Sequence, residues 1–180
     1  MYILGTCNPR GENNSYNGLY FKQSELNDIV SNRSLCGLPV KAEHTGADVG
    51  SIVSAYVDSE QKLNCVINIP EKNFQECLVA NLVRDRVALD LSMGYSVEVQ
   101  HTRRKEEQTS HPKLHARTKK TLEVSLVRKG ARKGCHIMAF EDKNGNLQWP
   151  VTKKDLQPDP NKPVSNDWTR FSNKFIDQPQ

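Results

Sequence analysis

Apolar and polar residues alternate along much of the chain, in short runs that are separated by turn-forming residues. A two-residue period is typical of β-strands with one buried face. The pattern predicts eight strands, at residues 2–4, 19–21, 38–40, 49–57, 63–69, 88–99, 122–127 and 135–140. The polar run at 58–61 lies between two of these strands and predicts a hairpin loop.

Two segments have a helical pattern instead. Ser24 is a candidate N-cap for a helix over residues 25–31. Pro70 opens a longer predicted helix that continues to Arg86, with an apolar residue at every fourth position. Many short strands and few helices favour a mainly β fold with peripheral helices (α+β), built as an antiparallel barrel or sandwich.

The length of 180 residues predicts one domain with a tail. We expect the domain to span residues 1–150. Within it, residues 101–120 are basic and lack any periodicity, which predicts a mobile loop. Several prolines after residue 150 predict a linker, followed by a short amphipathic stripe at 168–176, so that 151–180 form the tail.

Charge and cysteine content limit the classes of protein only weakly. The chain has 25 Lys and Arg against 21 Asp and Glu, a net charge of +4 that says little about partners. The five cysteines form no CxxC pair and lie mostly in apolar runs, as in a reduced intracellular protein. No apolar run approaches the roughly 20 residues of a membrane span. We therefore expect a soluble chain with no signal peptide and no membrane contact.

Ser92 is the first residue that suggests chemistry. Alternation over residues 89–98 places Ser92, Gly94 and Ser96 on the polar face of one strand. Gly94 would leave space above the Ser92 hydroxyl for a bound molecule. Two alternatives remain open on this strand: the polar face is an ordinary solvent-exposed face, or Ser96 is the nucleophile.

Glu123 and His44 are candidate partners for this serine. Glu123 interrupts an apolar run, and a half-buried carboxylate needs a partner such as an imidazole. The alternative is a strand whose other face, with Glu123 and Ser125, lies in water. His44 lies where a strand gives way to a turn, a common place for catalytic side chains, although a lone histidine there is more often structural.

The run GARKG at 130–134 predicts a tight basic turn after the Glu123 strand. Such a turn can direct a backbone N–H and a guanidinium at a developing oxyanion, although charged hairpin turns are common. Taken together, a base, a nucleophile and an acid in separate strands are the groups that acyl transfer by a serine hydrolase requires.

These segments resemble those of the herpesvirus capsid maturation proteases, the assemblin family, and are similar to segments of the prohead proteases of tailed phages. The resemblance rests on LPVKAEH at 38–44, LSMGY at 91–95 and EVSLV at 123–127 followed by GARKG. The LSMGY run is closer to the phage form of the nucleophile strand. Over about residues 1–140 the resemblance implies a herpesvirus-protease-like antiparallel β-barrel.

The resemblance also implies an activity and a site. It implies a serine endopeptidase in which Ser92 is the nucleophile, His44 the base and Glu123 the third member of the triad. The Ala131 N–H and the Arg132 side chain would form the oxyanion hole. Most herpesvirus members have a second histidine at the third position, whereas the phage enzymes have an acidic residue. The reaction needs no metal or cofactor.

The implied substrates are the scaffolding protein of a viral procapsid and the precursor of the protease itself. A herpesvirus-like enzyme would act in the host nucleus and a phage enzyme in the host cytoplasm. A homodimer is a further expectation. Because only roughly forty residues follow residue 140, the stripe at 168–176 would have to replace the dimer helix of the herpesvirus enzymes.

Three alternatives compete with this interpretation. The basic loop at 101–120 predicts a non-catalytic, capsid-associated or nucleic-acid-binding module, but the loop carries acidic residues and has no stacking rings except histidines. Cys36 is a second candidate nucleophile near His44, without an evident acidic partner. His111 or His115 could take the place of the base.

Overall fold

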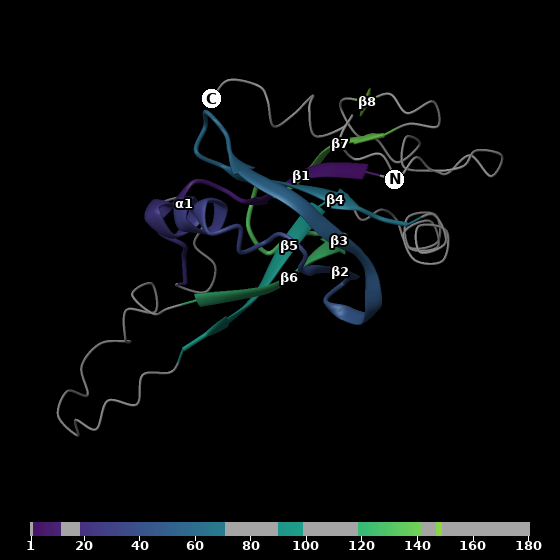
Figure 1. The fold of residues 1–180 in the computed structure, drawn as a ribbon, viewed down its shortest axis with the longest axis horizontal. Coiled ribbons are helices and arrows are strands. Elements are labelled where there is room, and N and C mark those ends of the chain that lie inside the picture. The colour runs from purple at the N-terminus through teal and green to yellow at the C-terminus, as the bar shows by residue number, and fades with distance from the viewer. Residues whose placement is uncertain (1, 12–18, 71–89, 99–118, 142–146, 149–180) are drawn as a thin grey trace.

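The computed structural model describes residues 2–11, 19–70, 90–98, 119–141 and 147–148. In this part of the chain, eight strands form one sheet and one helix lies beside it (Figure 1). The strand order across the sheet is β5-β6-β2-β3-β4-β1-β7-β8. The elements are β1 (Tyr2–Asn8), α1 (Gln23–Ser31), β2 (Pro39–Ala42), β3 (Thr45–Val57), β4 (Leu63–Asn68), β5 (Asp90–Val97), β6 (Lys119–Val127), β7 (Ile137–Glu141) and β8 (Leu147–Gln148).

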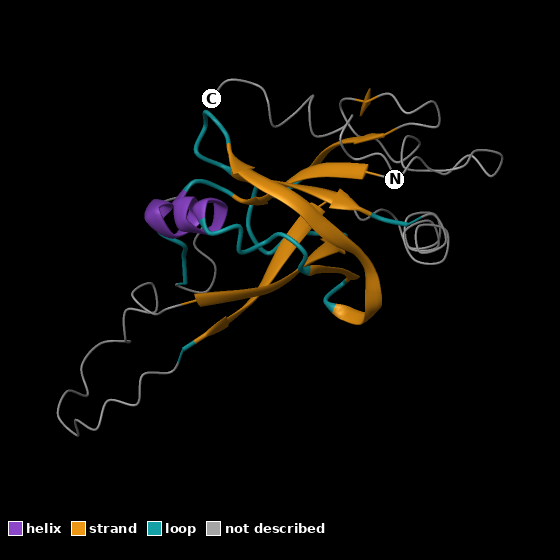
Figure 2. Cartoon of the chain, in the orientation of Figure 1, coloured by secondary structure: helices purple, strands orange, loops and turns teal. Residues whose placement is uncertain are grey.

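The sheet curls so that β5, at one end of the strand order, returns to the segment between β6 and β7. The Leu91 N–H donates to the Cys135 carbonyl at 2.8 Å, and Asp90 forms a bridge with His136. A Cβ at Gly5 of β1 would overlap the Leu91 side chain, so β1 and β5 meet closely. The result is a curled half-barrel with few helices (Figure 2), which confirms the predicted mainly β fold.

One pairing departs from the antiparallel pattern. β2 and β6 run parallel, with Val40 opposite Val124, while the other strand pairs are antiparallel in the described part of the chain. β2 and β6 are far apart in sequence, so alternation within either strand cannot indicate that they are neighbours.

Apolar side chains are buried on both faces of β1. Ile3 belongs to the larger core cluster, together with Leu26 of α1 and Ile52 of β3. Tyr2 and Leu4 belong to a second cluster, on the opposite face. Full burial of such side chains contributes about 1.5–3 kcal/mol each, so the two clusters fix the middle of the sheet.

The helix begins one residue earlier than Ser24, so the prediction of a Ser24 cap is wrong. Lys22 is the N-cap residue, and its N–H donates to Glu25 Oε2 at 2.7 Å. The Glu25 carboxylate therefore accepts a hydrogen bond from a backbone N–H group at the helix start. The predicted strand at 19–21 is also wrong: Leu19 forms only an isolated bridge, and Phe21 lies outside any strand and packs in the main core.

The hairpin predicted between β3 and β4 is confirmed. Asp58 Oδ1 accepts hydrogen bonds from the N–H groups of Glu60 and Lys62, at 2.9 Å each. The other Asp58 oxygen accepts from Asn64 Nδ2 at 2.9 Å. A single aspartate thus organises the loop and ties it to β4.

Several predictions lie wholly or partly outside the described residues. These are the helix from Pro70 to Arg86, the tail at 151–180 and most of the basic loop at 101–120. The last two residues of that predicted loop, 119 and 120, are the first two of β6. Among the described residues, no helix has the length and apolar character needed to cross a membrane.

Replacing Gly50 with alanine tests how closely β3 approaches β4. A Cβ at Gly50 would overlap the Asn68 carbonyl oxygen, and backbone cannot move aside as a flexible side chain can. We expect Gly50→Ala to lower the free energy of unfolding in urea by about 1–3 kcal/mol. Ser51→Ala, at the exposed neighbouring position, is the control and should change it by less than about 0.5 kcal/mol. Equal stability of the two variants would contradict the close approach.

Candidate active site

The register between β5 and β6 brings the first two candidate residues onto neighbouring strands. Ser92 lies opposite Ser125, and Gly94 lies opposite Glu123. Residues two apart on a strand share a face, so Glu123 and Ser125 project on the same side of β6. Both are buried, with 8% and 0% of their surface exposed, so the alternative in which they lie in water is wrong.

His44 reaches this site from a tight turn between β2 and β3. Ala42 pairs with Thr45, and the two residues between them, Glu43 and His44, have φ values of 51° and 60°. Two successive positive φ angles are typical of a type I′ turn, where Asn and Gly are the usual residues. For glutamate and histidine this conformation costs about 1–3 kcal/mol each, so surrounding contacts must hold it.

Hydrogen bonds with β6 and the residue after it hold the turn in place. The Glu43 N–H donates to the Leu126 carbonyl at 3.0 Å. The His44 N–H donates to Ser125 Oγ at 3.0 Å. The Arg128 N–H donates to Glu43 Oε1 at 2.8 Å. These contacts stabilise the strained turn and fix the His44 ring beside β6.

The His44 imidazole lies between Glu123 and Ser92. Its Nδ1 is hydrogen-bonded to Glu123 Oε1, and its Nε2 lies 2.9 Å from Ser92 Oγ. Ser92 is 7% exposed, so it does not lie on an ordinary solvent-exposed face. The structure thus brings together the nucleophile, base and acid expected from the sequence, in the order that proton transfer from a serine requires.

Gly94 and Ser125 complete the surroundings of Glu123. Glu123 Oε2 accepts a hydrogen bond from the Ser125 hydroxyl at 2.8 Å. A Cβ at Gly94 would overlap the Glu123 carboxylate. Gly94 therefore makes room for the carboxylate of the neighbouring strand, whereas the sequence suggested room above Ser92. The role of Ser125 was missed, although its two-residue spacing from Glu123 is visible in the sequence.

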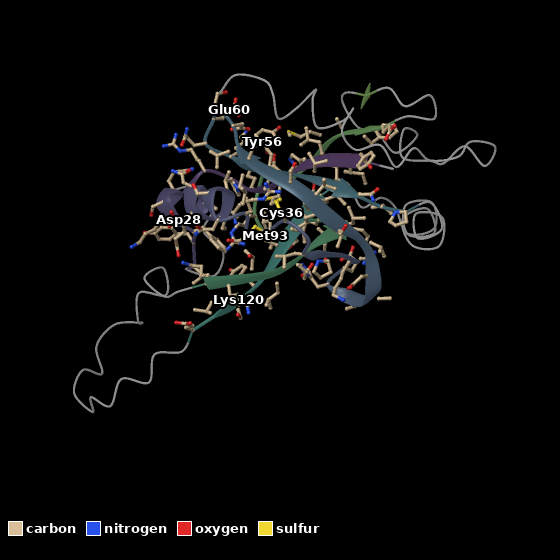
Figure 3. The ribbon with its side chains drawn as sticks, in the orientation of Figure 1. Asp28, Cys36, Tyr56, Glu60, Met93 and Lys120 are labelled. Atoms are coloured by element: carbon tan, nitrogen blue, oxygen red, sulfur yellow. The ribbon has the colours of Figure 1, made fainter. Side chains whose placement is uncertain are left out.

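Ser96, the alternative nucleophile, lies apart from this arrangement. The pairing of β5 with β6 shifts between Gly94 and Tyr95, and Ser96 is exposed opposite Lys120. Lys120 lies on the outer part of β6 in Figure 3, well away from the middle of the sheet. Ser96 is four residues from Ser92, about 13 Å along a strand. Ser92 is therefore the serine that faces the imidazole.

The turn at 130–134 is attached to the strand that carries Ser92. The Gly130 N–H donates to Asp90 Oδ2 at 2.8 Å, and a Cβ at Gly130 would lie 3.1 Å from the Leu91 carbonyl oxygen. Ala131, the next residue, is exposed. The turn therefore begins beside the residue that precedes Ser92. The sequence alone carries no signal for this role of Asp90, because its partner is a backbone N–H about 40 residues away.

Arg132 is held by an aromatic pair. Its Nη2 donates to Tyr95 Oη at 2.8 Å, and its guanidinium carbon lies 5.5 Å from the Phe21 ring centroid and 5.3 Å from that of Tyr95. The two rings meet edge to face, with centroids 4.9 Å apart. Cation–π contacts of this kind contribute about 0.5–2 kcal/mol. The oxyanion role expected for Arg132 stays a prediction.

The other candidate groups gain no support from the geometry. Burial raises the pKa of Cys135 to about 12 and that of Cys7 well above its usual value, so both stay as thiols. Both His44 ring nitrogens face Glu123 and Ser92, which leaves neither for Cys36. His111 and His115 lie outside the described residues. Among the described residues, no cluster of three His, Cys, Asp or Glu side chains could hold a metal ion.

Comparison with known proteins found similarity to solved structures only. No family model and no curated protein matches the chain. Kaposi's sarcoma-associated herpesvirus protease in complex with a hexapeptide phosphonate inhibitor is 19% identical, with a TM-score of 0.47, and the match covers 79% of this chain and 66% of that one. The same protease with a dimer disruptor is 17% identical, with a TM-score of 0.45 and coverages of 86% and 85%.

These similar structures are herpesvirus proteases, and both TM-scores lie below 0.5. The chain spans just under two thirds of the first of these structures. The similarity to phage prohead proteases stays a prediction. With identities below 20% and TM-scores below 0.5, these matches carry no argument about chemistry, so we base the chemistry on the geometry of Ser92, His44 and Glu123.

Replacing Gly94 with alanine tests whether this position protects the Glu123–His44 contact. The added methyl group would displace the carboxylate from His44 Nδ1. In the wild-type chain, the hydrogen bond to the carboxylate should give the His44 Nδ1–H a downfield proton NMR resonance, and we expect Gly94→Ala to lose it. Ser96→Ala, on the exposed part of the same strand, should leave the resonance in place. A downfield resonance that persists in Gly94→Ala would show that the Glu123–His44 hydrogen bond does not depend on the space at Gly94.

Proposed function

We propose that this chain is a serine endopeptidase with Ser92, His44 and Glu123 as its triad. One observation carries the proposal: the His44 ring joins a buried carboxylate on one side to the hydroxyl of a buried serine, 2.9 Å away, on the other. A serine hydroxyl is a weak nucleophile until a positioned base accepts its proton. The arrangement supplies that base and a group that orients it.

In the acylation step, Ser92 Oγ attacks the carbonyl carbon of a peptide bond while His44 Nε2 accepts the hydroxyl proton. The new C–O bond forms as the carbonyl π electrons move to oxygen. Glu123 stabilises the imidazolium through Nδ1. The intermediate then collapses: the C–N bond breaks, and the leaving amine takes the proton from Nε2.

Deacylation repeats the sequence with water. His44 Nε2 accepts a proton from a water molecule, which attacks the acyl carbon, and the proton then returns to Ser92 Oγ as the ester bond breaks. His44 is 41% exposed at its side chain, so solvent can reach the imidazole. The products are a carboxylic acid and a free enzyme in its starting state.

The oxyanion would be bound by the turn at 130–134. Ala131 is exposed and follows Gly130, whose N–H is bonded to Asp90 at the start of β5, and the Ala131 N–H makes no hydrogen bond within the described part of the chain. Removal of one such donor typically lowers turnover by about 100- to 1000-fold. We assign Arg132 the role of a second donor, with Tyr95 holding its guanidinium.

The motif resemblance extends the proposal to the substrates and to the compartment of the host cell. We propose that the enzyme cleaves the internal scaffolding protein of a viral procapsid and its own precursor, and that it acts as a homodimer. The site of action would be the host nucleus for a herpesvirus-like enzyme and the host cytoplasm for a phage enzyme.

Reaction with a fluorophosphonate tests the nucleophile. We expect mass spectrometry to find the adduct on Ser92 and on no other serine, because among the described residues only the Ser92 hydroxyl faces an imidazole. His44→Ala should slow labelling by about 1000-fold or more, and Glu123→Gln by up to about 10000-fold, as for other triads. Ser96→Ala is the control and should be labelled at the wild-type rate. A folded chain that stays unlabelled at Ser92 would refute the assignment.

A peptide library distinguishes an endopeptidase from other acyl hydrolases. We expect incubation with peptides derived from a whole proteome to yield products cut at internal bonds, with shared residues flanking the cleavage site. Ser92→Ala should yield none of these products. Hydrolysis of simple esters by the wild-type chain, with no peptide cut internally, would retain the serine hydrolase and exclude the endopeptidase.

A further inference from the structure

We propose that Ser125 is a positioning residue of this site, which ties the Glu123 carboxylate and the His44 backbone to one hydroxyl group. The inference rests on the proposed triad and deepens it. Ser125 acts through Glu123 and His44, so it is a fourth member of the hydrogen-bonded unit without contacting the reacting atoms.

The direction of both hydrogen bonds at Ser125 follows from the chemistry of the partners. The His44 backbone N–H can only donate, so Ser125 Oγ is the acceptor of that bond, at 3.0 Å. A hydroxyl has one proton of its own, which is left for Glu123 Oε2, at 2.8 Å. Ser125 is fully buried, so no water competes for either bond.

The first consequence concerns the carboxylate. The terminal torsion of a glutamate side chain is broad, so a single hydrogen bond leaves the plane of the carboxylate poorly defined. In this site His44 Nδ1 binds Oε1 and Ser125 binds Oε2. Contacts at both oxygens fix the plane and direct Oε1 at the imidazole.

The second consequence concerns the turn that carries the imidazole. His44 has a φ of 60°, a conformation that a histidine adopts only when its surroundings impose it. The bond from its N–H to Ser125 is one of the contacts that impose it. Because the same hydroxyl also holds Glu123, any shift of the turn and any shift of the carboxylate are coupled.

A purely structural role for Ser125 would require only one of its two hydrogen bonds. An acceptor for the His44 N–H is enough to satisfy a buried backbone donor, and the donation to Glu123 Oε2 is an additional contact. A buried hydroxyl in this fold also need not have such partners: the Ser54 hydroxyl of β3 is buried without one in the described part of the chain. Ser54→Ala is therefore a matched control for removing a buried hydroxyl.

The test compares Ser125→Ala, Ser125→Thr and Ser54→Ala in the full chain. Two readouts are measured: the rate of fluorophosphonate labelling at Ser92 and the downfield proton resonance of the His44 Nδ1–H. We expect Ser125→Ala to slow labelling by about 10- to 100-fold, the factor for one hydrogen bond to a charged group, and to shift the resonance upfield. Ser125→Thr keeps the hydroxyl and should restore both, while Ser54→Ala should leave both unchanged.

Two results would overturn the role of Ser125. One is wild-type labelling and an unchanged His44 resonance in Ser125→Ala. The other is slow labelling in both Ser125 variants with the resonance intact, which would leave Ser125 a packing role alone. Absence of labelling in the wild-type chain would instead refute the proposed function, and the resonance would then decide the role of Ser125 by itself.

Discussion

The burial of one carboxylate is the constraint on which this structure depends. Glu123 is 8% exposed in the middle of β6, and an unpaired buried carboxylate would cost several kcal/mol. The fold gives it two hydrogen-bond partners, the His44 ring and the Ser125 hydroxyl, and Gly94 leaves the space that it occupies. The same contacts that make the burial tolerable also orient the imidazole toward Ser92. Stability and proposed chemistry therefore share one set of hydrogen bonds.

The strained backbone of the β2–β3 turn lies beside the Glu123 carboxylate. Glu43 and His44 both adopt positive φ, and residues better suited to this turn would remove the imidazole. Bonds to Leu126 and Ser125 of β6 hold the turn, so the parallel pairing of β2 with β6 is a requirement for the site. A strained backbone held by its neighbours is a common feature of functional sites, because it positions a side chain before any ligand arrives.

Phe21 connects the helix side of the molecule to the turn at 130–134. Its ring makes cation–π contacts with both the Lys119 ammonium, 5.2 Å from the centroid, and the Arg132 guanidinium. Lys119 in turn pairs with Glu25 of α1 at 2.9 Å, and its side chain is 1% exposed. Moving either partner of such a pair away would leave a buried charge uncompensated, which is strongly destabilising. The turn beside Ser92 is thus supported by core packing as well as by its own hydrogen bonds.

Alternation in the sequence predicted most of the strands and the separate polar positions of Ser92 and Glu123, because burial on one face imposes a two-residue period. The end of the apolar run before His44 predicted the turn that carries it. It could not show that Glu123 lies between β5 and β2, because pairing between distant strands leaves no local pattern. Nor could it separate Ser92 from Ser96, which a shift in register divides, or show that Gly94 makes room for a neighbouring strand. Only the tertiary structure decided these contacts, since each joins residues about 30 or more positions apart or depends on a register between two strands.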